Sequence, residues 1–334
     1  MSIAANPTTQ FVLDQFDDAY ERENVRLDEI ASVFMDEWPS ERPTERYTYL
    51  EDVGNVGIWR RNESREAQAF RAVTWTTDTH DWQNKVEWHR NDDQDHQGRR
   101  KISQRAQKAA TMHALMRIRV GTQMIESSTD NTLLPAIPTA PDGATPFATT
   151  AGGAARYGAT NGNLLTGSGT VAQQIADDWF SVVQQFMSFT FPTSGNPLID
   201  PMEVMGGITL MYPVALVQEF AEAFKWSRPI YSDDASLASP TIGAATSNRV
   251  ADFNVPVRPF VNPYLSDTSD WYAFVDAVPE KAFYRQIKQN VEPDIWDRSN
   301  SDRARDEKVE AVGFDSRAGY GTGPTFGAIK VNNS

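Results

Sequence analysis

The chain contains no cysteine among its 334 residues. This absence excludes disulfide bonds, thiolate nucleophiles, iron–sulfur clusters and zinc sites that need sulfur ligands. It fits folding in a reducing compartment. A chain of about 300 residues buries roughly 75% of the surface that its unfolded form exposes, so its core needs no disulfide or metal for stability. The length allows two or three domains.

Basic residues and long apolar runs are also scarce. The chain has 31 Lys and Arg against 45 Asp and Glu, for a formal net charge of −14. This balance argues against a general nucleic-acid binder, because such proteins use clustered Lys and Arg to release counterions from phosphates. No apolar run approaches the ~20 residues of a membrane-spanning helix, and the first ten residues lack a secretory signal. We expect no contact with a membrane.

The four histidines do not form a recognisable metal motif. His89 and His96 flank an acidic connector that contains Asp92, Asp93 and Asp95. Their spacing matches no compact site such as H-x-x-x-H on a helix. A solvated connector that leads into a helix N-terminus, where carboxylates are favourable, explains the segment better.

Other catalytic motifs are missing as well. The Gly-rich segment 162–170 precedes an expected helix as a phosphate-binding loop does, but Ser168 stands where G-x-x-x-x-G-K-[ST] requires lysine. No serine lies in a G-x-S-x-G elbow. Adjacent carboxylates diverge on helices and strands alike, so none forms an acid–base pair. We predict no catalytic, cofactor-binding or metal-binding residue, and no enzymatic activity.

Two long amphipathic helices are predicted in the first third of the chain. Residues 11–38 carry apolar side chains at the spacing of one helical face until Pro39 and Pro43 interrupt the pattern. This helix packs either on its own domain or on a neighbour. Residues 99–125 form a second helix with one narrow apolar seam, in which His113 is best explained as a satisfied core histidine.

An aromatic β-hairpin is expected between these helices, over residues 46–90. Alternating side chains predict strands at 73–77 and 86–88, separated by a polar tip at 78–81. A two-stranded ribbon is marginally stable alone, so this one should lie on another surface.

The second half of the chain predicts a mixed region of helices and strands. Residues 127–170 are rich in Gly, Ala, Thr and Pro and suggest a long, weakly structured loop. A helix follows from about residue 170, and short strands are predicted at 206–212, 271–275 and 283–287. The fold class is therefore α+β.

This order of elements resembles the major capsid proteins of tailed phages with the Hong Kong 97 fold. More narrowly, it resembles the Mu-like major head subunit family. The resemblance is carried by segments spread along the chain: Tyr47–Leu50 with Gly57–Trp59, Asn84–Asp93 with Asp95 and Gly98, Gly207–Pro213, Asn262–Leu265, Asp270–Tyr272 with Gln286, and Gly313–Gly321. The region 127–170 departs from the family because it lacks the Asp-His-Pro element of Mu-like members.

The resemblance implies a division of the chain into four parts. An N-terminal arm covers residues 1–45, and an extended β-hairpin loop covers 46–97. Residues 98–195 supply part of a peripheral domain, with a spine helix at about 99–125 and a flexible loop at 127–170. Residues 196–334 form an axial domain together with strands that return to the peripheral domain.

The resemblance also implies a structural function without catalysis or cofactors. The chain would be the major capsid protein of a virion, assembled in the host cytoplasm into hexamers and pentamers of an icosahedral shell. Scaffold, portal and decoration proteins are the expected partners. The shell would enclose DNA without sequence-specific binding.

Candidate contacts between subunits follow from charge and aromatic placement. Arginines of the hairpin would meet the acidic connector of another copy, where ion pairs that are individually weak recur at every copy. The candidate contact residues are Arg60, Arg61, Arg65, Arg71, Trp75, Trp82, Asp92, Asp93, Asp95, Phe16 and Tyr20.

The alternative hypothesis is a carbohydrate- or ligand-binding module or enzyme that uses exposed aromatics around Trp75, Trp82 and Trp88 as platforms.

Overall fold

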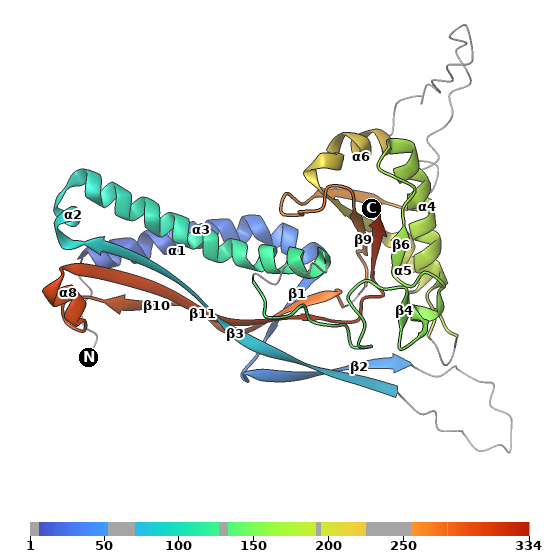
Figure 1. Cartoon of the computed structure of the whole chain (residues 1–334), viewed down its shortest axis with the longest axis horizontal. Coiled ribbons are helices and arrows are strands. Elements are labelled where there is room, and N and C mark those ends of the chain that lie inside the picture. Colours follow the sequence, from blue (N-terminus) through green and yellow to red (C-terminus); the bar gives the residue numbers. More distant parts are fainter. Residues whose placement is uncertain are drawn as a thin grey trace, which may run out of the picture.

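The computed structural model describes residues 7–52, 71–126, 133–191, 195–224, 255–278 and 280–333. The molecule is elongated, with two long helices lying over a twisted sheet and a second block of helices and strands at one end (Figure 1). Within the described ranges there are two five-stranded sheets, in the orders β1-β10-β11-β3-β2 and β6-β12-β9-β7-β8, and a small β4-β5 pair. The predicted α+β class is confirmed.

The first helix begins and ends four residues earlier than its sequence pattern predicted. Helix α1 (Pro7–Phe34) ends four residues before Trp38, and β1 (Met35–Pro39) follows directly. In β1, Met35 is buried and later residues alternate between half-buried and exposed, which is the period of a strand. Strand β1 pairs in parallel with β10 (Phe283–Trp296). This tertiary pairing outweighs the helical spacing of Trp38.

The predicted hairpin tip at residues 78–81 is wrong. Strand β3 (Arg71–His89) passes through these residues without a turn. Its first part pairs with β2 (Thr44–Asp52), and the part from Thr79 to His89 pairs with β11 (Val309–Thr322). Residues 78–81 mark the change of partner, and they contain no Gly or Pro that would favour a turn. The ribbon is therefore β2 with the first part of β3.

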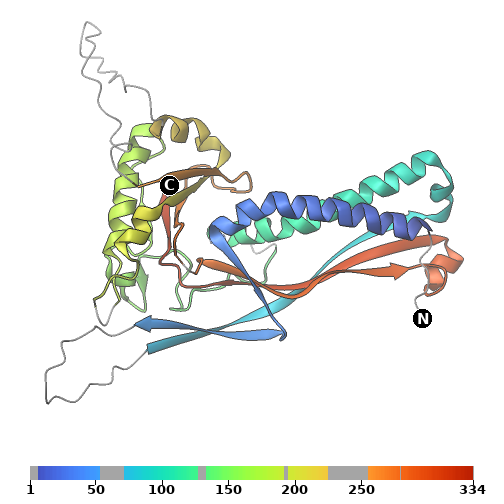
Figure 2. The ribbon, with the colours of Figure 1, turned by 180° about the vertical axis from the view of Figure 1, so that it is seen from behind.

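The predicted helix 99–125 is confirmed and extends from His96 to Glu126 as α3. Short helix α2 (Arg90–Gln94) precedes it. Helices α1 and α3 lie side by side in both views (Figures 1 and 2). They run in the same direction, because Gln15 bonds to Ser103 near one end and Phe34 meets Gly121 near the other.

The second block is built around its own sheet. Strands β7 (Ile208–Tyr212), β9 (Trp271–Val275), β12 (Ala328–Asn332), β6 (Leu164–Thr166) and β8 (Val257–Val261) form this sheet. Helices α4 (Ala172–Ser188), α5 (Pro201–Gly206) and α6 (Val217–Ala223) pack around it, with η2 (Val214–Leu216) before α6. Helix α4 therefore shares a core with this sheet, although its sequence lies before the expected boundary at residue 196.

Residues 133–166 contain little regular structure, as their composition suggested. They include β4 (Thr150–Ala151), β5 (Ala154–Ala155) and the 3-10 turn η1 (Arg156–Gly158) before β6. Many of these residues are nevertheless buried or half-buried. The expectation of a flexible loop at 127–132 falls outside the described residues.

The last strands return to the long sheet and join the two blocks. Strands β10 and β11 flank α8 (Asp302–Asp306) and carry the chain along the body and back. One core cluster contains Phe34 of α1, Phe283 of β10 and Phe274 of β9, so it spans both sheets. None of the helices in the described part of the chain has the length and apolar character needed to cross a lipid bilayer.

Candidate functional site

The described residues hold no group of three or more His, Asp or Glu side chains that could bind a metal ion. His89 instead caps α2, where its Nδ1 accepts a hydrogen bond from the backbone nitrogen of Asn91 at 3.2 Å. His113 lies 2.8 Å from the Ser316 hydroxyl. Burial, followed by the charge of Arg285, lowers the pKa of His113 to about 4, so this histidine is neutral at pH 7. It is half-buried and has a hydrogen-bond partner, which agrees with the expected structural role.

Four aromatic rings fix the base of the β2–β3 ribbon. Tyr284 of β10 stacks on Trp38 at 4.6 Å and meets Tyr47 at 5.0 Å between centroids. Trp75 donates from Nε1 to the Tyr284 hydroxyl at 2.7 Å, and Thr77 contacts the same hydroxyl. Rings from β1, β2, β3 and β10 thus meet at one point. This cluster joins β2 and the first part of β3 to β1 and β10.

The predicted aromatic platforms are used inside the chain. Trp75 is engaged by Tyr284, and Trp82 donates from Nε1 to the Ala318 carbonyl at 3.0 Å. Trp88 is only 3% exposed. These side chains therefore do not form a row of exposed rings for a sugar, and the alternative hypothesis loses the feature on which it rested.

The aromatic candidates of the first helix are likewise internal. Phe16 is 1% exposed and stacks on Phe314 with 3.5 Å between centroids. Tyr20 stacks on Phe16 at 5.7 Å and is half-buried. Phe16 is therefore wrong as a contact to a neighbour, because α1 packs on its own chain. The periodicity of α1 could not distinguish these two outcomes.

The charged candidates that the structure describes lie at opposite ends of β3. Arg60, Arg61 and Arg65 fall outside the described residues, and Arg71 is the first residue of β3. The acidic connector follows the other end of β3, with Asp92 and Asp93 in α2, Asp95 just after it, and the Asp92 and Asp95 side chains exposed. At about 3.3 Å per residue, the strand separates Arg71 from the acidic connector by roughly 60 Å. Arg71 therefore does not meet the acidic connector of its own chain.

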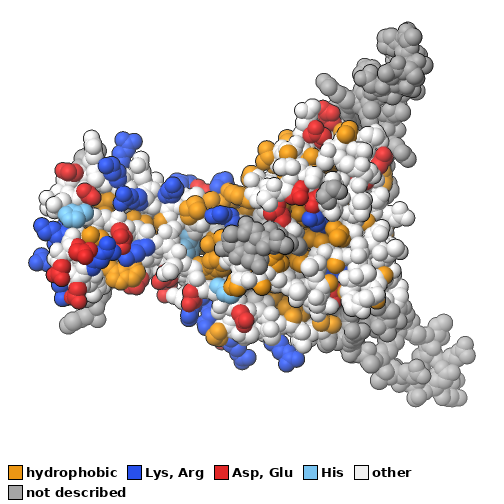
Figure 3. Space-filling view, in the orientation of Figure 1, with side chains coloured by type: hydrophobic (Ala, Val, Ile, Leu, Met, Phe, Trp, Pro, Cys, Tyr) orange, Lys and Arg blue, Asp and Glu red, His pale blue; other side chains and the backbone are white. Residues whose placement is uncertain are grey.

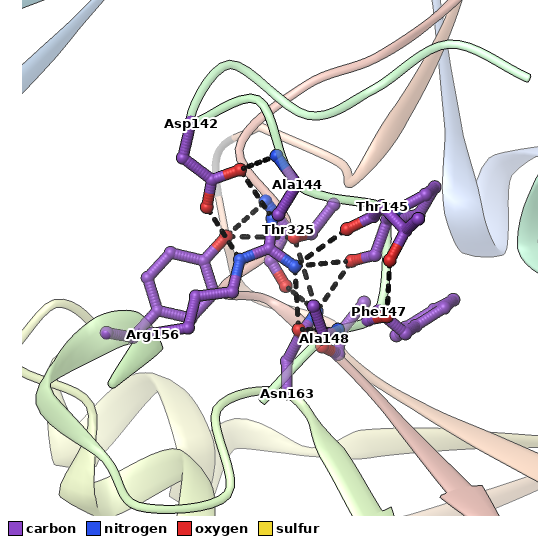
Figure 4. A network of polar contacts seen from close by, with 11 residues as sticks. Asp142, Ala144, Thr145, Phe147, Ala148, Arg156, Asn163 and Thr325 are labelled. Atoms are coloured by element: carbon purple, nitrogen blue, oxygen red, sulfur yellow. Dashed lines mark hydrogen bonds and ion pairs between the residues drawn. The ribbon is translucent and has the colours of Figure 1, made fainter. Parts of the chain in front are cut away.

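A buried arginine that the sequence did not single out organises residues 133–166 (Figure 4). Arg156 is 2% exposed and forms a two-pronged ion pair with Asp142, with N–O distances of 2.6 and 3.0 Å. Its Nη1 also donates to the carbonyls of Thr145 and Pro146 and to Asn163 Oδ1. The guanidinium thereby supplies the hydrogen bonds that a regular strand would otherwise provide.

Asn163 connects this network to the C-terminal strands. Its Nδ2 lies within hydrogen-bonding distance of the carbonyls of Pro146, Thr325 and Ala328. Tyr157 has a positive φ of 55° and its hydroxyl lies 2.8 Å from the Thr325 hydroxyl. Three separate segments are held together here. The network is structural, because every polar group in it bonds to another group of the chain.

A second charged network lies between α1 and β10. A cavity of about 280 Å³ is lined there by residues including Arg117, Arg285 and Glu37. Glu37 accepts from both arginines, at 3.3 and 3.0 Å, and Arg117 also pairs with Asp28 at 2.6 Å. Each guanidinium already has a carboxylate partner. These ion pairs therefore join α1, β1, α3 and β10. The cavity is not an open anion site.

Comparisons with known proteins identify the fold. No family model and no curated protein matches the chain. Solved structures match along nearly its whole length. The mature capsid of bacteriophage PhiM1 is 8% identical with a TM-score of 0.53, covering 90% of this chain and 85% of the other.

Two further solved structures agree. The virus-like particle of Pyrococcus furiosus is 9% identical with a TM-score of 0.52, covering 96% and 98% of the two chains. The capsid of an empty GTA particle is 10% identical with a TM-score of 0.52, covering 92% and 89%. Each of the three matches covers at least 90% of this chain. The chain has the capsid fold of the Hong Kong 97 type.

Proposed function

We propose that the chain is the structural subunit of a closed protein shell, the major capsid protein of a tailed phage. The observation that carries this proposal is the structural likeness to capsid and particle subunits over at least 85% of both chains. The shape agrees with it. A ribbon that extends beyond the sheet which anchors it reaches surfaces that its own chain does not cover.

The parts of the fold take distinct roles in this proposal. The β2–β3 ribbon is the extended loop that reaches a neighbouring subunit, and α3 is the spine helix that stiffens the body. The sheet of β6, β12, β9, β7 and β8 with α4, α5 and α6 is the axial domain, which gathers at the centre of hexamers and pentamers. The arginines at 60, 61, 65 and 71 meet Asp92, Asp93 and Asp95 of another copy.

The finer parts of the proposal rest on the sequence. The segments Gly207–Pro213 and Gly313–Gly321 support membership of the Mu-like major head subunit family. Scaffold, portal and decoration proteins are the proposed partners, with assembly in the host cytoplasm and residence in the virion. The net charge of −14 suits a shell that encloses DNA without binding its sequence, because an acidic wall does not hold the polyanion.

Negative-stain microscopy of the purified full chain at high concentration tests the proposal. We expect rings or closed shells, together with a fast-sedimenting species in analytical ultracentrifugation. Because a missing scaffold can prevent closure, the same measurement is made after co-expression with the genes that neighbour this one. A chain that remains a compact monomer under both conditions would falsify the proposal.

A further inference from the structure

Helix α3 carries a basic stripe on one side. The stripe consists of residues that recur every four or three positions and therefore share one helical face: Lys101, Arg105, Lys108, Met112, Leu115 and Arg119. The residues that face the sheet, such as Ile102 and Ala106, are buried, and Ser103 and Gln107 face α1. The charged residues of the basic stripe are exposed and lie outside the face that packs on α1. Met112 lies within it and is 40% exposed.

Helix α1 carries an acidic stripe with the same spacing. Its residues again share one helical face: Gln10, Asp14, Asp17, Glu21, Asn24 and Asp28. Apart from the half-buried Asn24, these side chains are exposed. Asp17 and Asp28 line the cavity beside Asn290 of β10. The acidic stripe thus borders β10, and its last residue, Asp28, pairs with Arg117 of α3.

The two stripes lie on opposite flanks of the molecule. In the sheet order β1-β10-β11-β3-β2, strands β10 and β3 lie on either side of β11. The basic stripe lies beside β3, because Arg105 donates to the Glu87 carbonyl at 3.1 Å, whereas the acidic stripe borders β10. Figure 1 has α3 in front, Figure 2 has α1 in front, and Figure 3 shows Lys and Arg side chains over α3.

The stripes also lie at the same height along the body. Gln15 accepts hydrogen bonds from Ser103 and Gln107 at 2.8 Å each, which fixes the register of the parallel helices. With this register, Asp14, Asp17 and Glu21 lie level with Lys101, Arg105 and Lys108. A second copy can therefore be placed beside the first without a shift along the long axis of the body. This placement brings the two sets of charges opposite each other.

The central charges of both stripes have no ion-pair partner among the described residues. This holds for Asp14, Asp17 and Glu21 on α1 and for Lys101, Arg105 and Lys108 on α3. Like charges at this spacing on a helix repel one another. Partial desolvation, followed by the neighbouring carboxylates Asp14, Glu21 and Asp18, raises the pKa of Asp17. The described part of the chain therefore supplies no opposite charge to the centre of either stripe.

We propose that the acidic stripe of α1 in one copy docks on the basic stripe of α3 in the next copy. This inference deepens the proposed shell function and rests on it. The contact is heterologous, with different surfaces of the two copies meeting, and such contacts generate rings when the rotation closes. The exposed Met112 lies in the middle of the interface, where it loses contact with water.

Charge-reversal variants test this pairing. One variant carries Asp14→Lys, Asp17→Lys and Glu21→Lys; a second carries Lys101→Glu, Arg105→Glu and Lys108→Glu. We expect each to need at least about tenfold more protein for assembly than the wild type, because like charges facing each other across an interface oppose association. An equimolar mixture of the two, and a chain with all six changes, should both assemble again.

The matched control uses exposed acidic residues of the same helix outside the stripe. Asp18→Lys with Glu29→Lys changes the charge of α1 by four units, against six for the triple variant, and it should assemble as the wild type does. Circular dichroism and the unfolding temperature of each unassembled variant establish that it folds. A variant that does not fold is replaced by its neutral counterpart, with Asn, Gln or Met in place of the charged residues, for which a smaller loss of assembly is expected.

The results separate this inference from the shell function itself. If the wild type assembles and the single-stripe variants assemble equally well, the pairing is overturned while the shell function stands. If the wild type does not assemble at all, the proposed function fails first.

A duplex DNA added to the wild type serves as a competitor. If DNA binding depends on Lys101, Arg105 and Lys108 while reversal of the acidic stripe leaves assembly unchanged, the basic stripe serves a polyanion and the pairing is wrong.

Discussion

Arg156 is a buried charged residue in a part of the chain that has little regular secondary structure. The guanidinium is balanced by Asp142, and its remaining donors reach two backbone carbonyls and Asn163. Removing one member of a buried ion pair costs more than the pair contributes, because the other member stays behind without a partner. The stability of residues 133–166 therefore depends strongly on this one side chain.

Replacement of Arg156 by Met tests this dependence. We expect Arg156→Met to lower the free energy of unfolding by about 3–5 kcal/mol, the usual range for breaking a buried pair. Urea unfolding of the unassembled chain measures it. Arg100→Met, at an exposed position of α3, is the control and should stay within about 0.5 kcal/mol of the wild type. Equal stabilities for the two variants would contradict the assigned role.

His113 makes stability depend on pH. Its pKa is about 4 in the folded chain because of burial and then Arg285, below the ordinary value of 6.5. The unfolded chain binds this proton more tightly, so the contribution is complete above pH 6.5 and is lost as the pH falls toward 4. The loss is roughly 3 kcal/mol.

The variant His113→Asn isolates this contribution. The difference in unfolding free energy between wild type and variant should shrink between pH 7 and pH 4.5, because the variant has no proton to gain at this position. Between pH 7.5 and pH 8.5 the difference should stay constant. A difference that is flat across the whole range would show that His113 titrates normally.

Gly121 of α3 lies directly against the ring of Phe34, the last residue of α1. A Cβ added at this position would lie 2.5 Å from the Cε2 of Phe34, a fully buried ring. Alanine is the better helix former, yet overpacking a core costs about 1–3 kcal/mol. We expect Gly121→Ala to destabilise the chain. Gly206→Ala is the matched control, since its Cβ would meet Ala277 at an ordinary 3.8 Å, and thermal unfolding compares the two.

The elements that the sequence predicts well are those whose own periodicity decides their structure. Helix α3 and strands β7 and β9 were found within a few residues because each has a long seam or a short apolar run. Strand β1 and the continuity of β3 were missed because partners far along the chain determine them. The pairings of Met35 with Phe283 and of Thr79 with Gly319 cannot be inferred from local spacing.

The candidate site was less predictable than the fold. Arg156 stands in a stretch of small and polar residues, and its acceptors include backbone carbonyls whose positions depend on the path of the loop. The lone arginine between Asp142 and residue 170 was the only available signal. Phe16 and Tyr20 have a clear sequence signal, the apolar stripe of a helix, which predicts that a surface covers them. The stripe does not indicate whether that surface belongs to the same chain or to a neighbour.

At the scale of the whole molecule, the two sheets share one core. Phe34 lies 6.3 Å from Phe274 of the second sheet and 6.5 Å from Phe283 of the first, between ring centroids. A shared core makes it unfavourable for either part to unfold alone.

We therefore expect the unassembled chain to unfold in one transition, with circular dichroism and tryptophan fluorescence giving the same midpoint. Phe34→Ala should lower the stability of this single transition by about 3–5 kcal/mol, because it opens a cavity at the junction. Two resolved transitions in the wild type would mean that the sheets are independent.

The unbroken backbone of β3 has a mechanical consequence. The same strand that forms the ribbon with β2 continues into the ladder with β11. A pull on the ribbon along its length is therefore transmitted as shear, which loads many hydrogen bonds of that ladder at once instead of opening them one after another. If the ribbon contacts a neighbour, tension between subunits is carried into the interior of the sheet, to the ladder between β3 and β11. A strand interrupted by a turn at residues 78–81 would have released that tension at a hinge.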